Sequence, residues 1–124
     1  MIVLIDSWAW IEYIKGSKNG ERVEEILETE KTILTSAMNI AEVYKKLLAD
    51  MPKEAQVLCQ KILKSAIVIP LDTEIALHAA KIKQEKKIGM ADAIVLATAE
   101  KTHAKVLTGD SDFKNLSNVI YLGS

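Results

Sequence analysis

Short runs of apolar residues alternate along the chain with segments in which apolar residues have helical spacing. The runs are continuous, without interleaved polar residues, and this is typical of parallel strands that are buried on both faces. They predict strands at residues 2–5, 32–34, 67–69, 105–107 and 119–122. The segments between them predict helices.

Two of these segments predict amphipathic helices, at residues 37–50 and 73–87. In the first, one face carries the apolar side chains of Ile40, Tyr44, Leu47 and Leu48. In the second, the corresponding side chains are those of Ile75, Ala79 and Ile82. Asp72 or Thr73, after Pro70, is the candidate N-cap residue of the second helix.

Further helices are expected at residues 7–14, 53–64 and 91–102. The last of these is apolar almost all round, so we expect it to be the most buried helix, with Asp92 in its first turn. The helix at 53–64 contains Cys59, which we interpret as a buried, inert thiol. The aromatic side chains near the first helix are expected in the core or at a subunit contact; they are Trp8, Trp10 and Tyr13.

Strands that alternate with helices predict a parallel sheet with right-handed crossovers on both faces. The expected fold class is therefore α/β, a three-layer sandwich with a central parallel sheet of about five strands. At 124 residues, without a linker or an internal repeat, the chain fits one domain over residues 1–124.

Composition narrows the possible functions. The chain has no run of about 18 apolar residues and its apolar start is interrupted at Asp6, so we expect no membrane segment and a cytoplasmic protein. One cysteine excludes disulfides and thiolate metal sites. A net charge of −1 gives no overall attraction for nucleic acid. Any polyanion must therefore be held locally.

Five carboxylates lie at the edges of the predicted strands and helices: Asp6, Glu42, Asp92, Asp110 and Asp112. A carboxylate at a core boundary costs several kcal/mol to desolvate unless it is paired or binds a cation. Ligands of open α/β sheets bind beyond the carboxyl ends of the strands. The loops after the first and fourth strands leave this same edge of the sheet, so their acids are expected to lie together at a ligand site. Mg²⁺ or Mn²⁺ is the cation that we expect there.

Each acid also has a purely structural interpretation. Asp6 is placed to cap the next helix, and Asp92 to complement a helix dipole. Glu42 lies opposite the apolar stripe and beside Lys45 and Lys46, where a surface salt bridge would explain it. Asp110 and Asp112 fit an ordinary turn.

Other chemistries lack their motifs. The chain has no phosphate-binding loop, no dinucleotide fingerprint and no nucleophile elbow. An EF-hand is excluded by Lys114, Asn115 and Tyr121 at positions that need other residues. His78 and His103 match no zinc spacing, so helix-surface or capping roles are expected for them.

Four segments together resemble the PIN-domain nucleases, most closely the VapC-type toxins of prokaryotic toxin–antitoxin pairs. They are DSWAWIEYIKG, TSAMNIAEVY, GMADAIVLATA and VLTGDSDF, in an order and spacing that span the chain from the first strand to the last. The resemblance implies a PIN-like fold and a ribonuclease that depends on Mg²⁺ or Mn²⁺. It also implies RNA as substrate, products with 5′-phosphate and 3′-hydroxyl ends, a cognate antitoxin protein and a homodimer.

The resemblance also assigns roles to residues. It places Asp6, Glu42, Asp92 and Asp110 in an acidic catalytic pocket, against the surface interpretation of Glu42. The implied metal ligands are Asp6, Asp92, Asp110 and Asp112, and the implied supporting residues are Ser7 and Thr108. Trp8 departs from the family, where a small or hydroxyl residue is common two positions after the first Asp.

Four lysines directly precede the GMADA segment: Lys81, Lys83, Lys86 and Lys87. A solvated helix face explains such a cluster. The alternative is that Lys86 and Lys87 contact RNA phosphates near the acids.

Two alternatives to the nuclease stay open, a receiver-like phosphoacceptor domain and a non-catalytic PIN-like binding module. Against the receiver, Asp6 is followed by Ser7 and not by a second acid.

Overall fold

The chain forms a five-stranded parallel sheet in the order β3-β2-β1-β4-β5. The computed structural model describes residues 1–123. All five predicted strands are present, although β2 and β4 extend further and β5 ends one residue earlier. The strands are β1 (Ile2–Ile5), β2 (Thr32–Ser36), β3 (Ile67–Ile69), β4 (Lys105–Thr108) and β5 (Val119–Tyr121).

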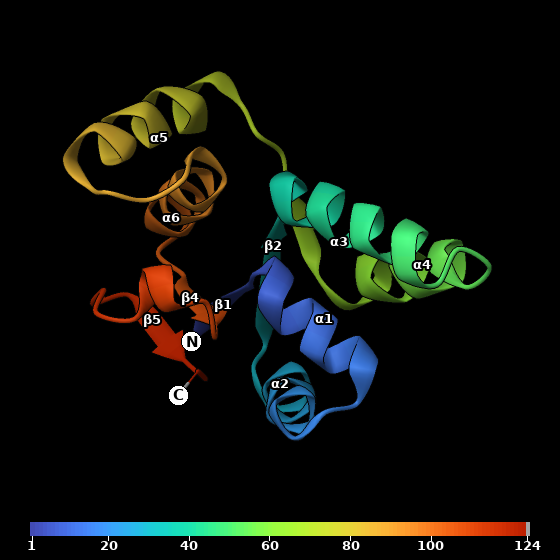
Figure 1. Ribbon diagram of the computed structural model, residues 1–124. Helices are drawn as coiled ribbons and strands as arrows, with labels where there is room; N and C mark the ends of the chain where they lie inside the picture. Colours follow the sequence, from blue (N-terminus) through green and yellow to red (C-terminus); the bar gives the residue numbers. More distant parts are fainter. Residues whose placement is uncertain (124) are drawn as a thin grey trace.

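Helices occupy the connections between the strands (Figure 1). They are α1 (Ser7–Lys15), α2 (Lys18–Thr29), α3 (Ala37–Asp50), α4 (Ala55–Ser65), α5 (Thr73–Glu85) and α6 (Met90–Thr102). A short 3₁₀ helix, η1 (Ser111–Phe113), follows β4. No helix was predicted at α2, which begins with the side chain of Ser17 accepting from the N–H of Gly20 at 3.0 Å.

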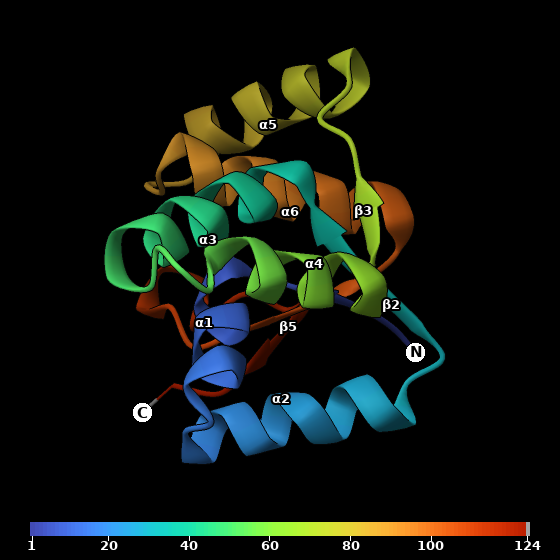
Figure 2. The same cartoon turned by 90° about the vertical axis from the view of Figure 1, so that its right-hand side faces the viewer.

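Two hydrophobic cores cover the two faces of the sheet, because successive side chains of a strand point to opposite faces. Leu4 of β1 packs in one core with residues of α5 and α6. Val3 and Ile5 pack in the other core with residues of α1, α2, α3 and α4. This is the expected three-layer α/β sandwich, and Figure 2 shows α5 and α6 on one side and the other helices opposite.

Helix α6 confirms the expected burial, since every residue from Ala93 to Ala99 is buried. Asp72 is the N-cap of α5, as one of the two candidates. The predicted stripe of α3 is partly wrong, because Leu48 is 48% exposed while Val43 and Leu47 are buried. The buried face is therefore rotated toward Val43, and Leu48 lies at its border.

Cys59, Trp10 and the lengths of the helices can be compared with the predictions from the sequence. Cys59 is a buried free thiol in α4, as expected. Trp10 is fully buried, and its indole N–H donates to Thr35 Oγ1 at 2.9 Å. Within residues 1–123, no helix combines the length and the apolar character that a membrane crossing requires.

Candidate metal-dependent active site

The C-terminal ends of β1 and β4 bring two of the predicted acids to one edge of the sheet. Asp6 directly follows β1, and Asp110 follows β4 after a short turn. The two strands pair in parallel with Ile5 opposite Leu107, and the N–H of Asp6 donates to the carbonyl of Leu107 at 3.3 Å. Both acids therefore leave the same edge, where open α/β sheets bind their ligands.

Asp92, Asp110 and Asp112 form a tight group, in which one carboxylate oxygen from each lies within 4.8 Å of the others. The turn after β4 holds Asp110 in place: its N–H donates to Thr108 Oγ1 at 3.0 Å, and its carboxylate accepts from the N–H of Asp112 at 3.0 Å. Asp92 comes from the first turn of α6. Two segments that are distant from each other thus contribute to one small volume.

Asp6 is buried, and it interacts electrostatically with Asp110 of this group. Its carboxylate accepts from the N–H of Ala9 at 3.0 Å, so the predicted N-cap role is confirmed. The pKa of Asp6 is raised from 3.8 to about 7. Desolvation by burial is the largest cause, the charges of Asp110 and Glu42 add to it, and the hydrogen bonds from Thr108 and Ala9 oppose it. The capping bonds therefore leave the negative charge of Asp6 largely uncompensated.

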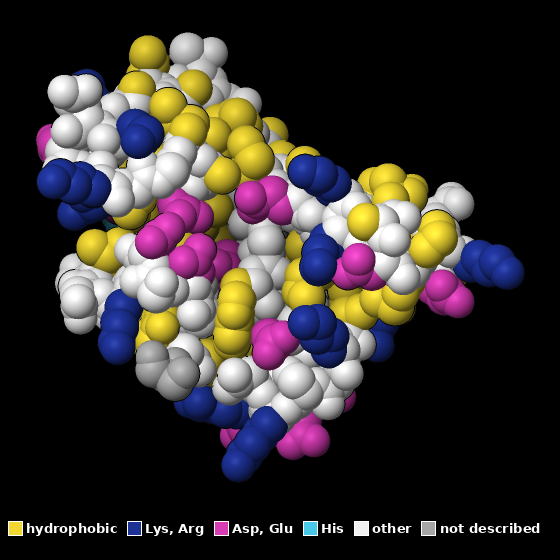
Figure 3. All heavy atoms as spheres, in the orientation of Figure 1, with side chains coloured by type: hydrophobic (Ala, Val, Ile, Leu, Met, Phe, Trp, Pro, Cys, Tyr) yellow, Lys and Arg dark blue, Asp and Glu magenta, His cyan; other side chains and the backbone are white. Residues whose placement is uncertain are grey.

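Asp92 has the same electrostatic problem. Desolvation raises its pKa from 3.8 to about 7, and the nearby charges of Asp110, Asp112 and Glu42 contribute to the rise. Glu42 thus acts on Asp6 and on Asp92, although it comes from α3 in the opposite layer. The five predicted acids form one electrostatically coupled set, which we call the acidic group. Figure 3 shows Asp and Glu side chains gathered in a hollow between α6 and the side of α1 and α3.

Glu42 is exposed, but its carboxylate is not free. Its Oε1 accepts from the hydroxyl of Ser7 at 2.6 Å. The salt bridge that periodicity suggested is wrong: within residues 1–123 Glu42 pairs with neither neighbouring lysine, and Lys46 pairs instead with Asp50 at 3.0 Å. The Glu42 carboxylate turns toward α1 and away from the next turn of its own helix.

Asn39 is a polar contributor that the sequence interpretation missed. It is buried, and its Nδ2 donates to Ser7 Oγ at 3.1 Å. Its Oδ1 accepts from the N–H of Ser36 at 3.2 Å, as part of a capping box at the start of α3. The spacing of Ser36 and Asn39, Ser-x-x-Asn before a helix, was the available signal.

Trp8 supports the turn that carries Asp110. A Cβ atom on Gly109 would lie 2.3 Å from the Trp8 ring, so only glycine lets the ring pack against this turn. Trp8 is half-buried and also lines a cavity of about 280 Å³ with Ser7 and Glu42. The large side chain at this position therefore packs against the turn that carries Asp110, and Ser7 beside it bonds Glu42.

The donor set fits a hard divalent cation. Carboxylate oxygens are the protein ligands that Mg²⁺ and Mn²⁺ prefer. Within residues 1–123, no lysine, arginine or histidine forms an ion pair with any member of the acidic group; the ion pairs engage other acids. Three carboxylates share one small volume, and the pKa values of Asp6 and Asp92 are raised, so a bound divalent cation would offset a repulsion that no ion pair among residues 1–123 offsets.

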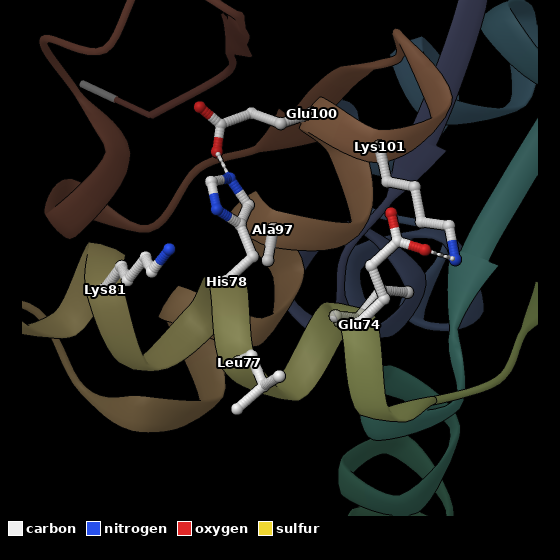
Figure 4. Close-up of a pocket in the computed structure, with 8 residues that line it drawn as sticks. Glu74, Leu77, His78, Lys81, Ala97, Glu100 and Lys101 are labelled. Atoms are coloured by element: carbon white, nitrogen blue, oxygen red, sulfur yellow. Dashed lines mark hydrogen bonds and ion pairs between the residues drawn. The ribbon is translucent and has the colours of Figure 1, made fainter.

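The histidines lie away from the acidic group. His78 of α5 pairs with Glu100 of α6 at 2.9 Å, and His103 is the left-handed C-cap of α6. Figure 4 shows His78 in a cavity of about 430 Å³ between these helices, where Lys101 also pairs with Glu74 at 3.2 Å. The cavity is lined by none of the five predicted acids, and His78, Glu100, Lys101 and Glu74 are engaged in pairs with one another, so it is not the predicted site. Both histidines have the surface and capping roles that were expected.

The two lysines proposed for RNA contact lie in the connection from α5 to α6. Both are exposed. Lys86 lines a cavity of about 310 Å³ together with Leu96, Asn115 and Asn118, and these asparagines follow η1. Lys86 therefore lies beside the segment that continues from Asp112, while an RNA contact by Lys86 or Lys87 stays a prediction.

The fold, together with carboxylates at the ends of β1 and β4, defines a class of protein. The sequence matches the model of the PIN domain over residues 3–119, so the chain belongs to the PIN domain family. This confirms the resemblance found in the sequence. The receiver-like alternative has a flavodoxin-like strand order of 2-1-3-4-5, which differs from the order observed here.

Solved structures with this fold include toxin–antitoxin proteins. A toxin–antitoxin complex from Klebsiella pneumoniae matches with a TM-score of 0.80 at 23% identity over 95% of each chain. VapBC2 from Rickettsia felis, bound to a promoter DNA fragment, matches with a TM-score of 0.78 at 19% identity over 100% of this chain and 99% of that chain. VapC20 from Mycobacterium tuberculosis, described as a Sarcin-Ricin loop cleaving toxin, matches with a TM-score of 0.78 at 17% identity over 94% and 96%. No match was found among curated proteins.

Proposed function

We propose that this protein is a metal-dependent endoribonuclease and the toxin of a type II toxin–antitoxin pair. The observation that carries the proposal is the acidic group itself, which gathers carboxylates from the ends of β1 and β4 with those of α3 and α6. Membership of the PIN domain family and the similarity to toxin–antitoxin structures support it.

The side chains divide the work between holding a cation and handling water. Asp92, Asp110 and Asp112 would hold Mg²⁺ or Mn²⁺, with Asp6 as a further ligand. When bound, the ion supplies a Lewis acid that polarises a phosphodiester and lowers the pKa of a water. Glu42, whose Oε1 accepts from the Ser7 hydroxyl, would have its other carboxylate oxygen available to orient a water and accept a proton. Thr108 fixes Asp6 and Asp110 through its hydroxyl.

Cleavage of defined RNAs tests the proposal. We expect the purified protein with millimolar Mg²⁺ or Mn²⁺ to cut structured or single-stranded RNA and to leave 5′-phosphate ends. Asp110→Asn should abolish cutting, whereas Asp50→Asn, on the exposed end of α3, should not. Intact RNA in every preparation, with the variants indistinguishable, would refute the nuclease and favour a non-catalytic PIN-like module. If the protein cuts RNA, sequencing of RNA ends after brief induction identifies the target.

A protein partner follows from the same proposal. The neighbours described above as toxin–antitoxin complexes favour a cognate antitoxin, whose arginine or lysine would compete with the cation for the acidic group. We expect the product of the adjacent gene to bind this chain and inhibit cleavage, with weaker binding to Asp110→Asn. An equal affinity of the antitoxin for the wild type and for Asp110→Asn would exclude the acidic group as the contact.

Self-association is the second expected contact. Leu77 on α5 is 63% exposed beside the cavity between α5 and α6, and such an apolar surface suits a second copy of the chain. We expect a homodimer in solution that Leu77→Asp converts to a monomer. Val57→Asp is the matched control, because Val57 is 72% exposed but lies on α4 in the opposite layer. Light scattering after gel filtration distinguishes the two states.

A further inference from the structure

Asn39 connects the interior of the protein to the acidic group through two hydrogen bonds. Its Nδ2 donates to Ser7 Oγ at 3.1 Å, and the Ser7 hydroxyl donates to Glu42 Oε1 at 2.6 Å. Asn39 is 1% exposed, whereas Glu42 is exposed. A chain of two hydrogen bonds thus connects the buried amide of Asn39 to the exposed carboxylate of Glu42.

The direction of each bond is fixed by its partners. The backbone N–H of Ser36 can only donate, so the atom of Asn39 that it meets at 3.2 Å must be the amide oxygen. The amide nitrogen therefore faces Ser7 and donates to the Ser7 oxygen. The single proton of the Ser7 hydroxyl is then left for Glu42, whose Oε1 accepts it at 2.6 Å.

We propose that Asn39 is a positioning residue for the water-handling carboxylate of Glu42, and that it acts through Ser7. The inference rests on the proposed function, in which Glu42 orients the attacking water. An exposed glutamate side chain can adopt many rotamers. Because the Ser7 hydroxyl accepts from Asn39, its proton points to Glu42, and this hydrogen bond favours one rotamer of Glu42. Asn39 thereby sets the orientation of a group that it does not touch.

A purely structural role for Asn39 makes a different prediction. Asn39 is half of a capping box, and in the other half the Ser36 side chain accepts from the backbone N–H of Asn39. Ser36 Oγ also accepts from the N–H of Met38 at 3.1 Å. Ser36→Ala removes both of these bonds and leaves the contact with Ser7 intact. It is the matched control, since it weakens the start of α3 but does not disturb Glu42.

Steady-state cleavage kinetics separate the two roles. We expect Asn39→Ala and Ser7→Ala each to lower kcat by about 10-fold to 100-fold with KM unchanged, the size typical of groups that orient a functional ligand. The double variant should lose no more than the more impaired single variant, because both act on Glu42. Ser7→Thr should restore kcat, and Ser36→Ala should keep it. Multiplicative losses in the double variant, or an equal loss in Ser36→Ala, would overturn the proposal.

A second readout needs neither RNA nor metal. The ¹³C chemical shift of the Glu42 carboxylate, measured by NMR in the metal-free protein, should change in Asn39→Ala and in Ser7→Ala and stay constant in Ser36→Ala. A wild-type protein that shows these shifts but cuts no RNA would refute the proposed nuclease and retain the hydrogen-bond chain. If the protein cuts RNA but Asn39→Ala changes neither the Glu42 chemical shift nor kcat, the positioning role alone is refuted.

Discussion

Removing the charge of Asp6 should stabilise the metal-free protein at alkaline pH. The pKa of Asp6 is raised from 3.8 to about 7, first by desolvation and then by the charges of Asp110 and Glu42. The folded protein therefore holds this proton more tightly than the unfolded chain does. The contribution of Asp6 to stability is fully present below about pH 4 and is lost as the pH rises through about 7. Asp6→Asn removes this dependence and keeps the N-cap, because Asn and Asp cap helices equally well.

The size of the effect follows from the two pKa values of Asp6. A rise from 3.8 to about 7 corresponds to about 4 kcal/mol between the fully protonated and the fully ionised protein. By linkage, about 2 to 3 kcal/mol of this falls between pH 5 and pH 8. Asp6 is 5% exposed, so solvent screening does little to reduce the value. For a domain of this size, the corresponding change in Tm is roughly 10 °C.

Thermal unfolding in EDTA, from pH 5 to pH 8, measures this difference between wild type and Asp6→Asn. Asp72→Asn is the control, because Asp72 also caps a helix, by accepting from the N–H of Ile75 at 2.8 Å. The hydrogen bond from Lys101 lowers the pKa of Asp72. Its contribution is thus present at neutral pH and lost in acid, so Asp72→Asn should destabilise at pH 8. If Tm depends on pH in the same way in the wild type and in Asp6→Asn, the conclusion that the charge of Asp6 is uncompensated is refuted.

Three further outcomes are expected. Millimolar Mg²⁺ at 100 times its Kd should stabilise the wild type by about 2.7 kcal/mol, and Asp92→Asn should lose most of this rise in Tm; an equal rise would place the cation elsewhere. Reversing Lys86 and Lys87 to Glu should weaken RNA binding and reduce its salt dependence by about 0.7 in the slope for each phosphate that is no longer neutralised; unchanged binding would return them to a solvated face. Gly109→Ala should lower both Tm and cleavage, because the new Cβ meets the Trp8 ring at 2.3 Å, and an unchanged Tm would show that the ring does not support the turn.

Local patterns were sufficient to predict most of the fold. Continuous apolar runs predicted every strand. The central strands β1, β2 and β4 are largely buried and have no polar side to mask the signal, and the edge strand β3 has the same apolar run although Ile67 is 60% exposed. Helix α2 was missed because charged residues outnumber apolar ones along it, and its burial depends on Val23 packing into a core that other segments create. The place of Leu48 was wrong for a related reason. Helical spacing gives the width of an apolar stripe, while the facing layer decides which edge of it is covered.

The candidate site was less accessible to the same reasoning. Asp6 and Asp110 could be placed together from strand topology alone, since both follow parallel strands at one edge. Glu42 could not, because its helix lies in the opposite layer and its position on that helix predicts a surface salt bridge. It took the family resemblance to move it into the site. The contribution of Asn39 depends on Ser7 lying opposite α3, a contact between segments 32 residues apart that no periodicity encodes.

Asp6 shows why the acidic group is better explained by chemistry than by stability. Capping α1 requires one acceptor at Ala9, and Asn or Ser would supply it without a charge. A carboxylate at this buried position instead places a charge next to Asp110 and Glu42 and has its pKa raised to about 7. In the metal-free protein that charge reduces the free energy of unfolding above neutral pH. A bound divalent cation reverses the sign, because it favours the ionised form that burial disfavours. The stability order of wild type and Asp6→Asn at pH 8 should therefore invert between EDTA and saturating Mg²⁺, and an order that stays the same in both would leave the buried charge without its proposed role.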